Sequence, residues 1–153
     1  MLPEYDRYKP KDNVTIEVTE DNFSLPRRAT QMAVGFDLFA TKDCIIRPLD
    51  RKLIGTGIKL EMPTGIEGQV RSRSGLAYKH GVFVLNSPGT IDPDYRGEVK
   101  VCLWNSADKY CIIHAGECIA QIIFQEVPQF SLKEVASLDD TERGEGGFGS
   151  SGL

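Results

Sequence analysis

The sequence predicts an all-β protein, and three features of its pattern carry that prediction. Short stretches alternate between apolar and polar residues with a period of two, as in Val14 to Val18, where Val14, Ile16 and Val18 share one face. Turn-forming residues separate these stretches, and no long amphipathic helical pattern is visible. Many short strands in one chain favour a sandwich, a jelly roll or a barrel, because these architectures protect strand edges.

The expected elements follow in chain order, beginning with a half-buried strand at Val14 to Val18. Nine further strands are predicted at Gly35 to Ala40, Cys44 to Ile46, Lys52 to Ile54, Ile58 to Met62, Gly68 to Arg71, Val82 to Leu85, Glu98 to Asn105, Tyr110 to Ile113 and Cys118 to Glu126. The stretch from Ser74 to His80 could form a short helix that begins near Ser74, or it could remain a loop.

The 153 residues fit one domain of ordinary size. We divide the chain into a polar N-terminal extension (1–13), a β domain (14–137) and a Gly-rich C-terminal arm (138–153). Glycine at the density found in the arm packs poorly and loses much backbone entropy on ordering. The arm is therefore expected to be mobile unless a ligand orders it.

Composition excludes several classes of function. The formal net charge is −4, and no stretch shows the clustering of Lys and Arg that a nucleic-acid backbone requires. No apolar run approaches the length of a membrane span, and the four cysteines form no C-x-x-C pair. We expect a soluble, intracellular protein with reduced thiols, cytoplasmic or, in a eukaryote, nuclear, that binds neither nucleic acid nor membrane.

Two segments carry candidate chemistry next to predicted strands. Arg73-Ser74-Gly75 could direct a guanidinium, a hydroxyl and backbone N–H groups at one anion, although a solvated turn has the same composition. The segment Asn86 to Asp92 looks like a tight turn between strands, in which Asn86 could read a planar ligand edge or simply form an Asx-turn. Asp92 follows an apolar Ile91 and should face the opposite side.

The arm is a third candidate. Its Gly-rich run could wrap phosphates with backbone N–H groups, while Arg143 supplies charge and Phe148 an aromatic face. A Walker loop is excluded because no Gly-Lys-Ser/Thr follows and no strand precedes the run. The alternative is a flexible terminus with no role in binding.

Taken together, these segments resemble the five ordered motifs of the trimeric dUTPases (deoxyuridine triphosphate nucleotidohydrolases). The resemblance covers roughly residues 14 to 153, and its motifs stand at Ala33 to Ala40, Arg73 to Ala77, Gly89 to Gly97, Gly116 to Gln121, and Arg143 to Gly152. One departure is Ser72, which stands where many members of the family have proline.

The resemblance implies a distorted jelly-roll barrel that assembles as a homotrimer, with an active site at each subunit junction and the arm closing over a neighbour's site. It implies hydrolysis of dUTP to dUMP and pyrophosphate with Mg²⁺, which limits uracil in DNA and supplies dUMP for dTTP synthesis. Asp92 would hold and deprotonate the attacking water. Asp37 would touch a metal-bound water from outside, although it could equally satisfy backbone groups.

The remaining implied contacts divide between the two ends of the substrate. The phosphate end would be held by Arg73, Ser74, Gly75, Gln121, Arg143, Gly149, Ser150 and Ser151. The nucleoside end would be held by Asn86, Gly89, Thr90, Ile91, Tyr95, Lys100 and Phe148. Within the second set, Asn86 and the following strand would read uracil, Tyr95 would exclude a 2′-hydroxyl, and Phe148 would stack on the base.

Two other functions share most of these features. A deaminase acting on dCTP shares the implied fold, although it is not expected to carry the Gly-rich arm in this form. A binding or regulatory protein could instead keep the nucleotide site and signal its occupancy to a partner. The presence of Asp92 and Arg143 favours catalysis over both alternatives.

Overall fold

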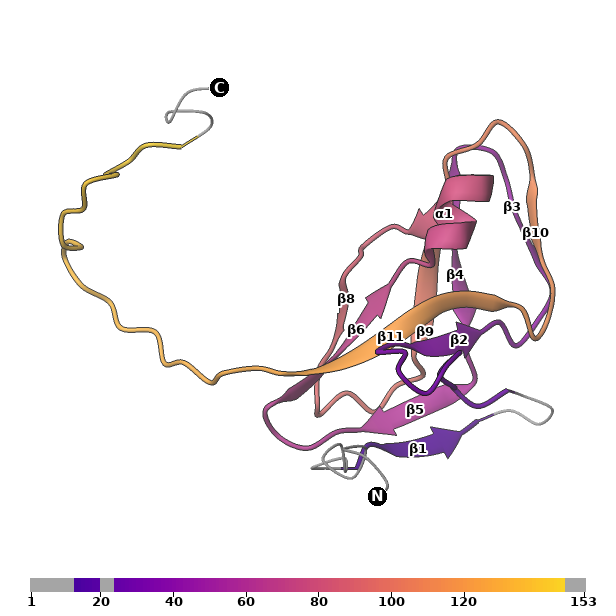
Figure 1. The fold of residues 1–153 in the computed structure, drawn as a ribbon, viewed down its shortest axis with the longest axis horizontal. Coiled ribbons are helices and arrows are strands. Elements are labelled where there is room, and N and C mark those ends of the chain that lie inside the picture. The colour runs from indigo at the N-terminus through magenta and orange to yellow at the C-terminus, as the bar shows by residue number, and fades with distance from the viewer. Residues whose placement is uncertain (1–12, 20–23, 148–153) are drawn as a thin grey trace, which may run out of the picture.

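The computed structural model describes residues 13–19 and 24–147, and within them the prediction of an all-β protein is confirmed (Figure 1). The elements are β1 (Thr15–Val18), β2 (Phe36–Phe39), β3 (Cys44–Ile46), β4 (Asp50–Gly55), β5 (Ile58–Glu61), β6 (Ile66–Arg71), α1 (Ser74–His80), β7 (Val82–Val84), β8 (Gly89–Ile91), β9 (Lys100–Asn105), β10 (Cys111–Ile113) and β11 (Cys118–Glu126). The ten predicted strands all form, with ends that shift by at most two residues.

One prediction about a strand was wrong. We expected Asn86 to Asp92 to be a tight turn, but Gly89–Ile91 forms strand β8, which pairs with β6 in the register Gly68↔Ile91 and Val70↔Gly89. The strand is three residues long and starts at a glycine, so it has no alternation that a sequence pattern could reveal. Its pairing with β6 is a tertiary contact.

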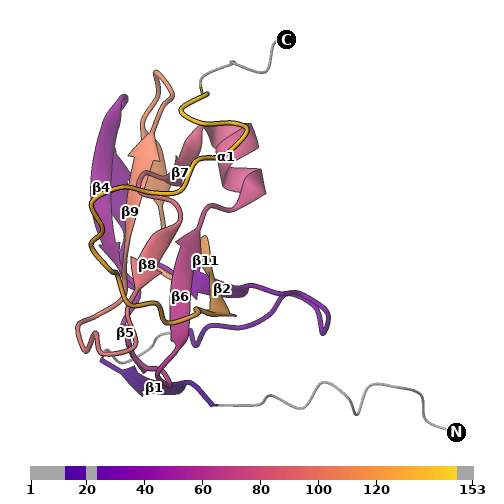
Figure 2. The ribbon, with the colours of Figure 1, turned by 90° about the vertical axis from the view of Figure 1, so that its left-hand side faces the viewer.

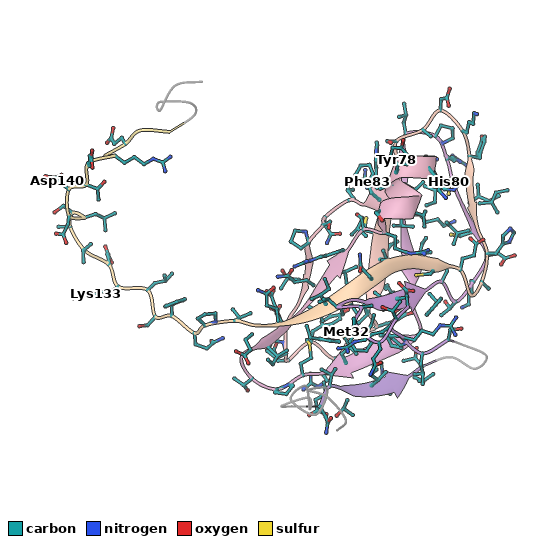
Figure 3. The ribbon with its side chains drawn as sticks, viewed as in Figure 1. Met32, Tyr78, His80, Phe83, Lys133 and Asp140 are labelled. Atoms are coloured by element: carbon teal, nitrogen blue, oxygen red, sulfur yellow. The ribbon has the colours of Figure 1, made fainter. Side chains whose placement is uncertain are left out.

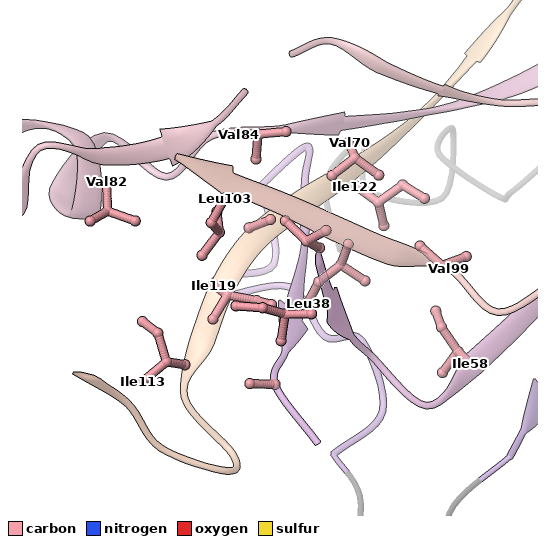
Figure 4. Close-up of a cluster of buried hydrophobic side chains, with 14 of the residues drawn as sticks. Leu38, Ile58, Val70, Val82, Val84, Val99, Leu103, Ile113, Ile119 and Ile122 are labelled. Carbon is pink, nitrogen blue, oxygen red and sulfur yellow. The ribbon is translucent and has the colours of Figure 1, made fainter. Parts of the chain in front are cut away.

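The described strands form four antiparallel sheets around one core (Figures 1 and 2). The largest has the order β2-β11-β6-β8 and the next β4-β9-β7, while β1-β5 and β10-β3 are two-stranded. Side chains from these sheets meet in a cluster that includes Leu38, Val70, Leu103, Ile119 and Ile122, each at most 3% exposed (Figure 4). Full burial of such a side chain contributes about 1.5–3 kcal/mol, so this cluster supplies much of the driving force for folding.

The first strand differs from its prediction. Every residue of β1 is exposed, including Ile16 at 38% and Val18 at 47%. Among the described residues β1 pairs only with β5, and no second layer covers it. With Met32, Val34 and Phe124, Ile16 lines an apolar groove of about 820 Å³. The face expected to be half buried is therefore open.

The short helix α1 begins at Ser74 and ends where the sequence places a glycine. Gly81 adopts a left-handed conformation (φ 66°) and its N–H donates to the carbonyl of Ala77, which closes the last turn. Within the described residues, no helix is long and apolar enough to cross a membrane.

After Glu126 the chain leaves the body as an extended segment without regular structure through residue 147 (Figures 1 and 2). This segment begins before the expected boundary at residue 138, and from here on we call all of it, from residue 127, the arm. Its apolar side chains point into solvent, with Phe130 at 84% and Leu132 at 100% exposure. Residues 1–12 of the proposed N-terminal extension lie outside the described residues.

Candidate functional site

One group of predicted site residues meets where β6 runs into α1, and we call it the β6–α1 corner (Ser72, Arg73, Ser74, Gly75 and Gln121). Gln121 lies opposite Arg71 in the β11–β6 pairing, and its Nε2 donates to the carbonyl of Ser72 at 3.1 Å. Ser74 and Gly75 are exposed, and a Cβ at Gly75 would meet no atom within 4 Å. The corner therefore presents an open backbone with a hydroxyl and a guanidinium beside it.

Arg73 is held in place by β11. Its Nη1 donates to the carbonyl of Cys118 at 2.7 Å. Burial raises the pKa of the Cys118 thiol to about 12; Arg73 lowers the pKa, and a hydrogen bond with Asp37 raises it further. The thiol is therefore neutral, and it connects Arg73 with Asp37, the residue expected near the metal.

A glycine makes room for Gln121. A Cβ at Gly35 would stand 2.3 Å from Oε1 of Gln121 and 3.3 Å from the Cβ of Gln121. Rotating the Gln121 amide alone would not relieve the second of these contacts. Glycine at position 35 of the first motif thus leaves room for Gln121 of the fourth motif to keep its hydrogen bond to Ser72.

The second group lies on β8 and the turn after it, and we call it the β8 segment (Asn86 to Tyr95). Asn86, Thr90 and Asp92 are exposed, whereas Gly89 is buried. Asn86 folds over β8, since a Cβ on Gly89 would stand 3.1 Å from its Nδ2. Asp92 begins a turn that closes with a hydrogen bond from Tyr95 N to its carbonyl at 3.1 Å. The exposed carboxylate therefore projects from a fixed backbone.

Glu98 contacts two of the predicted site residues, Tyr95 and Lys100. Tyr95 Oη donates to the Glu98 carbonyl at 3.1 Å, and the Lys100 ammonium lies 3.7 Å from the Glu98 carboxylate. The same carboxylate accepts a hydrogen bond from the N–H of Gly57 at 3.0 Å. Lys100, predicted as a ligand contact, is thus already paired with Glu98.

The two groups are not together in one chain. On one side of β6, Ile91 lies opposite Gly68, so the next residue, Asp92, is level with Glu67. On the other side of β6, Gln121 of β11 lies opposite Arg71, four residues further along β6 than Glu67. At about 3.3 Å per residue and 4.8 Å between strands, the backbones of Asp92 and Gln121 are about 16 Å apart. The two groups therefore occupy separate places on the sheet.

The arm does not reach either group. Arg143 is exposed, and its Nε donates to the carbonyl of Gly146 at 2.7 Å within a turn of the arm itself. Figure 3 shows Lys133 and Asp140 on the arm well away from the body. Phe148, Gly149, Ser150 and Ser151 lie outside the described residues.

The acidic residues near the corner do not form a metal cage. Among the described residues, no three His, Cys, Asp or Glu side chains are grouped so that they could hold a metal ion. Asp37 is the carboxylate of the corner, placed opposite Gln121 in the β11–β2 pairing. A single carboxylate fits a cation that is bound mainly by substrate phosphates and retains its waters, as Mg²⁺ does.

Sequence reasoning missed three residues that shape the site. Ser72 was a departure of unknown effect, but its Oγ accepts a hydrogen bond from Val84 N at 2.9 Å and thereby fastens the corner to β7. Cys118 and Glu98 act on site residues through the contacts described above. Cys118 lies within the fourth motif and Glu98 directly follows the third, and this position was the signal that could have identified them.

The chain is similar to known proteins over most of its length. The family model for dUTPase matches residues 21–152. The deoxyuridine 5'-triphosphate nucleotidohydrolase of Hydrogenobaculum sp. is 50% identical over 139 residues, which is 90% of this chain and 96% of the relative. That of Clostridium kluyveri is 52% identical over 128 residues, or 84% and 90% of the two chains.

A solved structure extends the agreement to the fold. A mutant dUTPase of Staphylococcus bacteriophage 80alpha with dUpNHpp matches with a TM-score of 0.85 at 25% identity, covering 93% of this chain and 99% of its own. The family model alone spans most of the sequence, and the matched residues contain the β6–α1 corner and the β8 segment. The chain therefore belongs to the dUTPase family.

Proposed function

We propose that this protein is a dUTP diphosphatase that hydrolyses dUTP to dUMP and pyrophosphate by attack of water on the α-phosphorus. The observation that carries the proposal is the placement of its motifs: an open corner fit for phosphates and an exposed aspartate on a fixed turn, both within the matched family region. The named activity of the relatives, which are about 50% identical over most of the chain, supports the same reaction.

Asp92 is the proposed general base. The residue is exposed, and the turn closed by Tyr95 fixes the backbone from which its carboxylate projects. It orients a water molecule and accepts its proton as the oxygen attacks the α-phosphorus. Positioning and charge stabilisation contribute most of the acceleration, as is general in phosphoryl transfer.

The β6–α1 corner is the proposed phosphate site. Arg73 supplies positive charge, while Ser74, Gly75 and Gln121 supply hydrogen-bond donors around the bond that breaks. Mg²⁺ bound to the triphosphate would neutralise its charge, and Asp37 would accept a hydrogen bond from one of the retained waters. Arg143 and residues 149–151 of the arm close on the terminal phosphate.

The β8 segment is the proposed nucleoside site. The backbone of Gly89, Thr90 and Ile91, with the Asn86 amide, matches the uracil edge and leaves cytosine with unpaired polar groups, at about 1–3 kcal/mol each. Tyr95 packs against the deoxyribose and excludes a 2′-hydroxyl. Phe148 stacks on the base, and Lys100 is an additional contact.

A homotrimer is the proposed assembly. The separation of Asp92 from Gln121 along the sheet supports it, since a neighbouring copy could place its own β6–α1 corner closer to Asp92. A closed ring of copies would join the β8 segment of one to the β6–α1 corner of the next. The substrate, together with the four free thiols, supports a location inside the cell.

A turnover assay tests the proposal directly. The purified protein is given dUTP, dCTP or UTP with Mg²⁺, and the nucleotide products and pyrophosphate are separated by chromatography. We expect dUMP and pyrophosphate from dUTP, with dCTP and UTP turned over at least 100-fold more slowly, a difference of about 2.7 kcal/mol. Release of ammonia from dCTP would identify a deaminase. Tight binding of dUTP without turnover would identify a regulatory protein.

A further inference from the structure

The turn between β7 and β8 carries Asn86, the residue proposed to read the base, and we call it the Asn86 turn (Leu85 to Pro88). It leaves β7 after Val84 and enters β8 at Gly89. Every residue of the turn is exposed, so it has little packing of its own. The N–H of Ser87 donates to the carbonyl of Val84 at 3.2 Å and closes the turn. The place of Asn86 therefore depends on how the two ends of the turn are attached.

The far end of the turn is attached to β6. Gly89 begins β8 and lies opposite Val70 of β6 in the antiparallel pairing of the two strands (Figure 2). A Cβ at Gly89 would stand 3.5 Å from the Cβ of Val70 and 3.1 Å from Nδ2 of Asn86. The Asn86 amide is thus packed on the backbone of β8, close to β6.

The near end of the turn is attached through Val84. Strand β7 is the edge of its sheet and, among the described strands, pairs only with β9. The N–H of Leu85 donates to the carbonyl of Cys102 in β9 at 2.9 Å. Since successive N–H groups of a strand point to opposite sides, the N–H of Val84 points away from β9. Val84 is 2% exposed, so this N–H has little access to water, and a buried N–H without a partner is costly.

Ser72 supplies the partner for this N–H. Its Oγ accepts a hydrogen bond from the N–H of Val84 at 2.9 Å. Ser72 follows Val70 by two residues, so this one segment of the chain holds both ends of the Asn86 turn. The carbonyl of Ser72 accepts a separate hydrogen bond from Nε2 of Gln121 at 3.1 Å. Ser72 thus contacts the turn through its hydroxyl and a proposed phosphate ligand through its backbone.

We propose that Ser72 is a positioning residue for recognition of the base: its hydroxyl fixes the Asn86 turn and thereby strengthens discrimination between uracil and cytosine. The inference rests on the proposed function, in which the Asn86 amide reads the uracil edge. Removing the hydroxyl leaves the Val84 N–H without this partner and frees one end of the turn. The hydrogen bond from Gln121 is accepted by the backbone of Ser72 and remains. The effect therefore falls on the nucleoside end of the substrate.

Binding of non-hydrolysable analogues of dUTP and dCTP tests the proposal. In Ser72→Ala we expect the affinity for the dUTP analogue to fall about three- to tenfold, the range of one hydrogen bond, while the affinity for the dCTP analogue changes less than about twofold. The kcat for dUTP should stay within about twofold of the wild type. Ser72→Thr keeps a hydroxyl on the same carbon and should bind both analogues as the wild type does. An unchanged preference for uracil in Ser72→Ala, or a Ser72→Thr that behaves like Ser72→Ala, would overturn the proposal.

Ser106→Ala is the matched control. The Ser106 Oγ donates to the carbonyl of Gly81 at 2.8 Å, next to the other end of β7. The variant therefore removes a serine hydroxyl that bonds the backbone beside the same strand without touching the Asn86 turn. It should keep the affinities and the uracil preference of the wild type. An equal loss in Ser106→Ala would mean that general loosening of β7, and not the Ser72 hydrogen bond, sets the preference.

Hydrogen exchange measures the hydrogen bond itself. Exchange of the Val84 amide should be at least about tenfold faster in Ser72→Ala than in the wild type or in Ser106→Ala. Equal rates would mean that the Ser72 hydroxyl does not protect this N–H, and would overturn the inference. Thermal melting establishes that each variant folds. If Ser72→Ala does not fold, Ser72→Cys takes its place, because sulfur is a weaker acceptor and should shift each quantity in the same direction.

A double variant distinguishes this inference from the proposed function. Asn86→Ala should reduce the preference for the dUTP analogue by itself, and adding Ser72→Ala should cause no further loss, because Ser72 acts through Asn86. Independent losses would overturn the role of Ser72 and leave that of Asn86 in place. No effect of Asn86→Ala on the preference would overturn the proposed nucleoside site and this inference with it. Absence of dUTP turnover in the wild type would overturn the proposed function as a whole.

Discussion

At the scale of single residues, the environment of each side chain decides which chemistry it can perform. Asp92 is exposed on a turn that is closed by a backbone hydrogen bond, whereas Cys118 is half buried between Arg73 and Asp37. The first is suited to accept a proton from water, and the second is suited to stay neutral. The same two residues therefore carry one prediction about catalysis and one about stability.

Asp92→Asn should leave the fold and nucleotide affinity nearly unchanged and lower kcat by about 10² to 10⁴, the usual contribution of a general base. The amide keeps the size of the carboxylate and can still orient water, but it cannot accept the proton. Single-turnover kinetics and a binding isotherm for a non-hydrolysable dUTP analogue measure the two effects separately. Asp94→Asn, two residues away and equally exposed, is the control and should retain activity. Full turnover by Asp92→Asn would assign the base elsewhere.

The Cys118 thiol should make the protein sensitive to alkali. Its pKa is raised to about 12 in the folded state, mainly by burial, so the folded protein keeps a proton that the unfolded chain loses above pH 9. The folded state is then favoured less as the pH rises, and the contribution present below pH 9 is lost between pH 9 and about 12. Urea unfolding from pH 8 to 11 should show a steeper loss for the wild type than for Cys118→Ala. Parallel curves would mean that the thiol titrates normally.

At the scale of elements, short segments take positions that their own sequences do not specify. Strand β8 exists because β6 pairs with it, and Ser72 fastens the β6–α1 corner to β7 through one hydrogen bond. The arm is the opposite case, since none of its described residues belongs to a helix or strand and none is fully buried. Removing the arm should therefore affect function without affecting the fold.

Deletion of Thr141 to Leu153 should leave an assembled protein of near-normal melting temperature, because the described residues of this segment contribute no core. The truncated protein should still bind nucleotide but turn over dUTP at least about tenfold more slowly, a loss of about 1.4 kcal/mol of transition-state stabilisation. Closure of the arm would exclude water and add phosphate contacts.

Limited proteolysis gives an independent check on the arm. Cleavage near Arg143 should slow when a non-hydrolysable dUTP analogue and Mg²⁺ are added to the intact protein. Equal cleavage with and without ligand, together with full turnover by the truncated chain, would reduce the arm to a flexible terminus.

At the scale of the whole molecule, the divided site makes a quantitative prediction. Asp92→Asn and Arg73→Ala are each expected to be nearly inactive. Unfolding and refolding them together should produce mixed trimers in which about one site in four combines an intact Asp92 with an intact Arg73 from different copies. Turnover should then recover to about a quarter of the wild-type value.

The control for this mixing experiment uses two variants of the same segment. Asn86→Ala and Asp92→Asn both alter the β8 segment, which each site takes from one copy, so their mixture should recover no activity. No recovery in the first mixture would mean that one chain supplies both halves of a site. Recovery in the control would mean that Asn86 and Asp92 of one site come from different copies, so that the β8 segment does not act as a unit.

The sequence alone determined the class of fold and most of the elements. Alternation with a period of two located ten strands, because successive side chains of a strand point to opposite faces of the sheet. Gly81 ended α1 because glycine tolerates a left-handed backbone. The motifs also predicted the reaction, hydrolysis of dUTP, since the resemblance to the family rests on residue types and their order in the sequence.

The tertiary structure decided what depends on contacts between distant segments. Only the pairing of β6 with β8 and β11 showed that Asp92 and Gln121 stand apart. The exposure of β1 also departed from its pattern, because burial requires a covering layer and the part of the chain that the structure describes supplies none. The local sequence pattern indicates which face of a strand is apolar, while the arrangement of the other strands determines whether that face is buried.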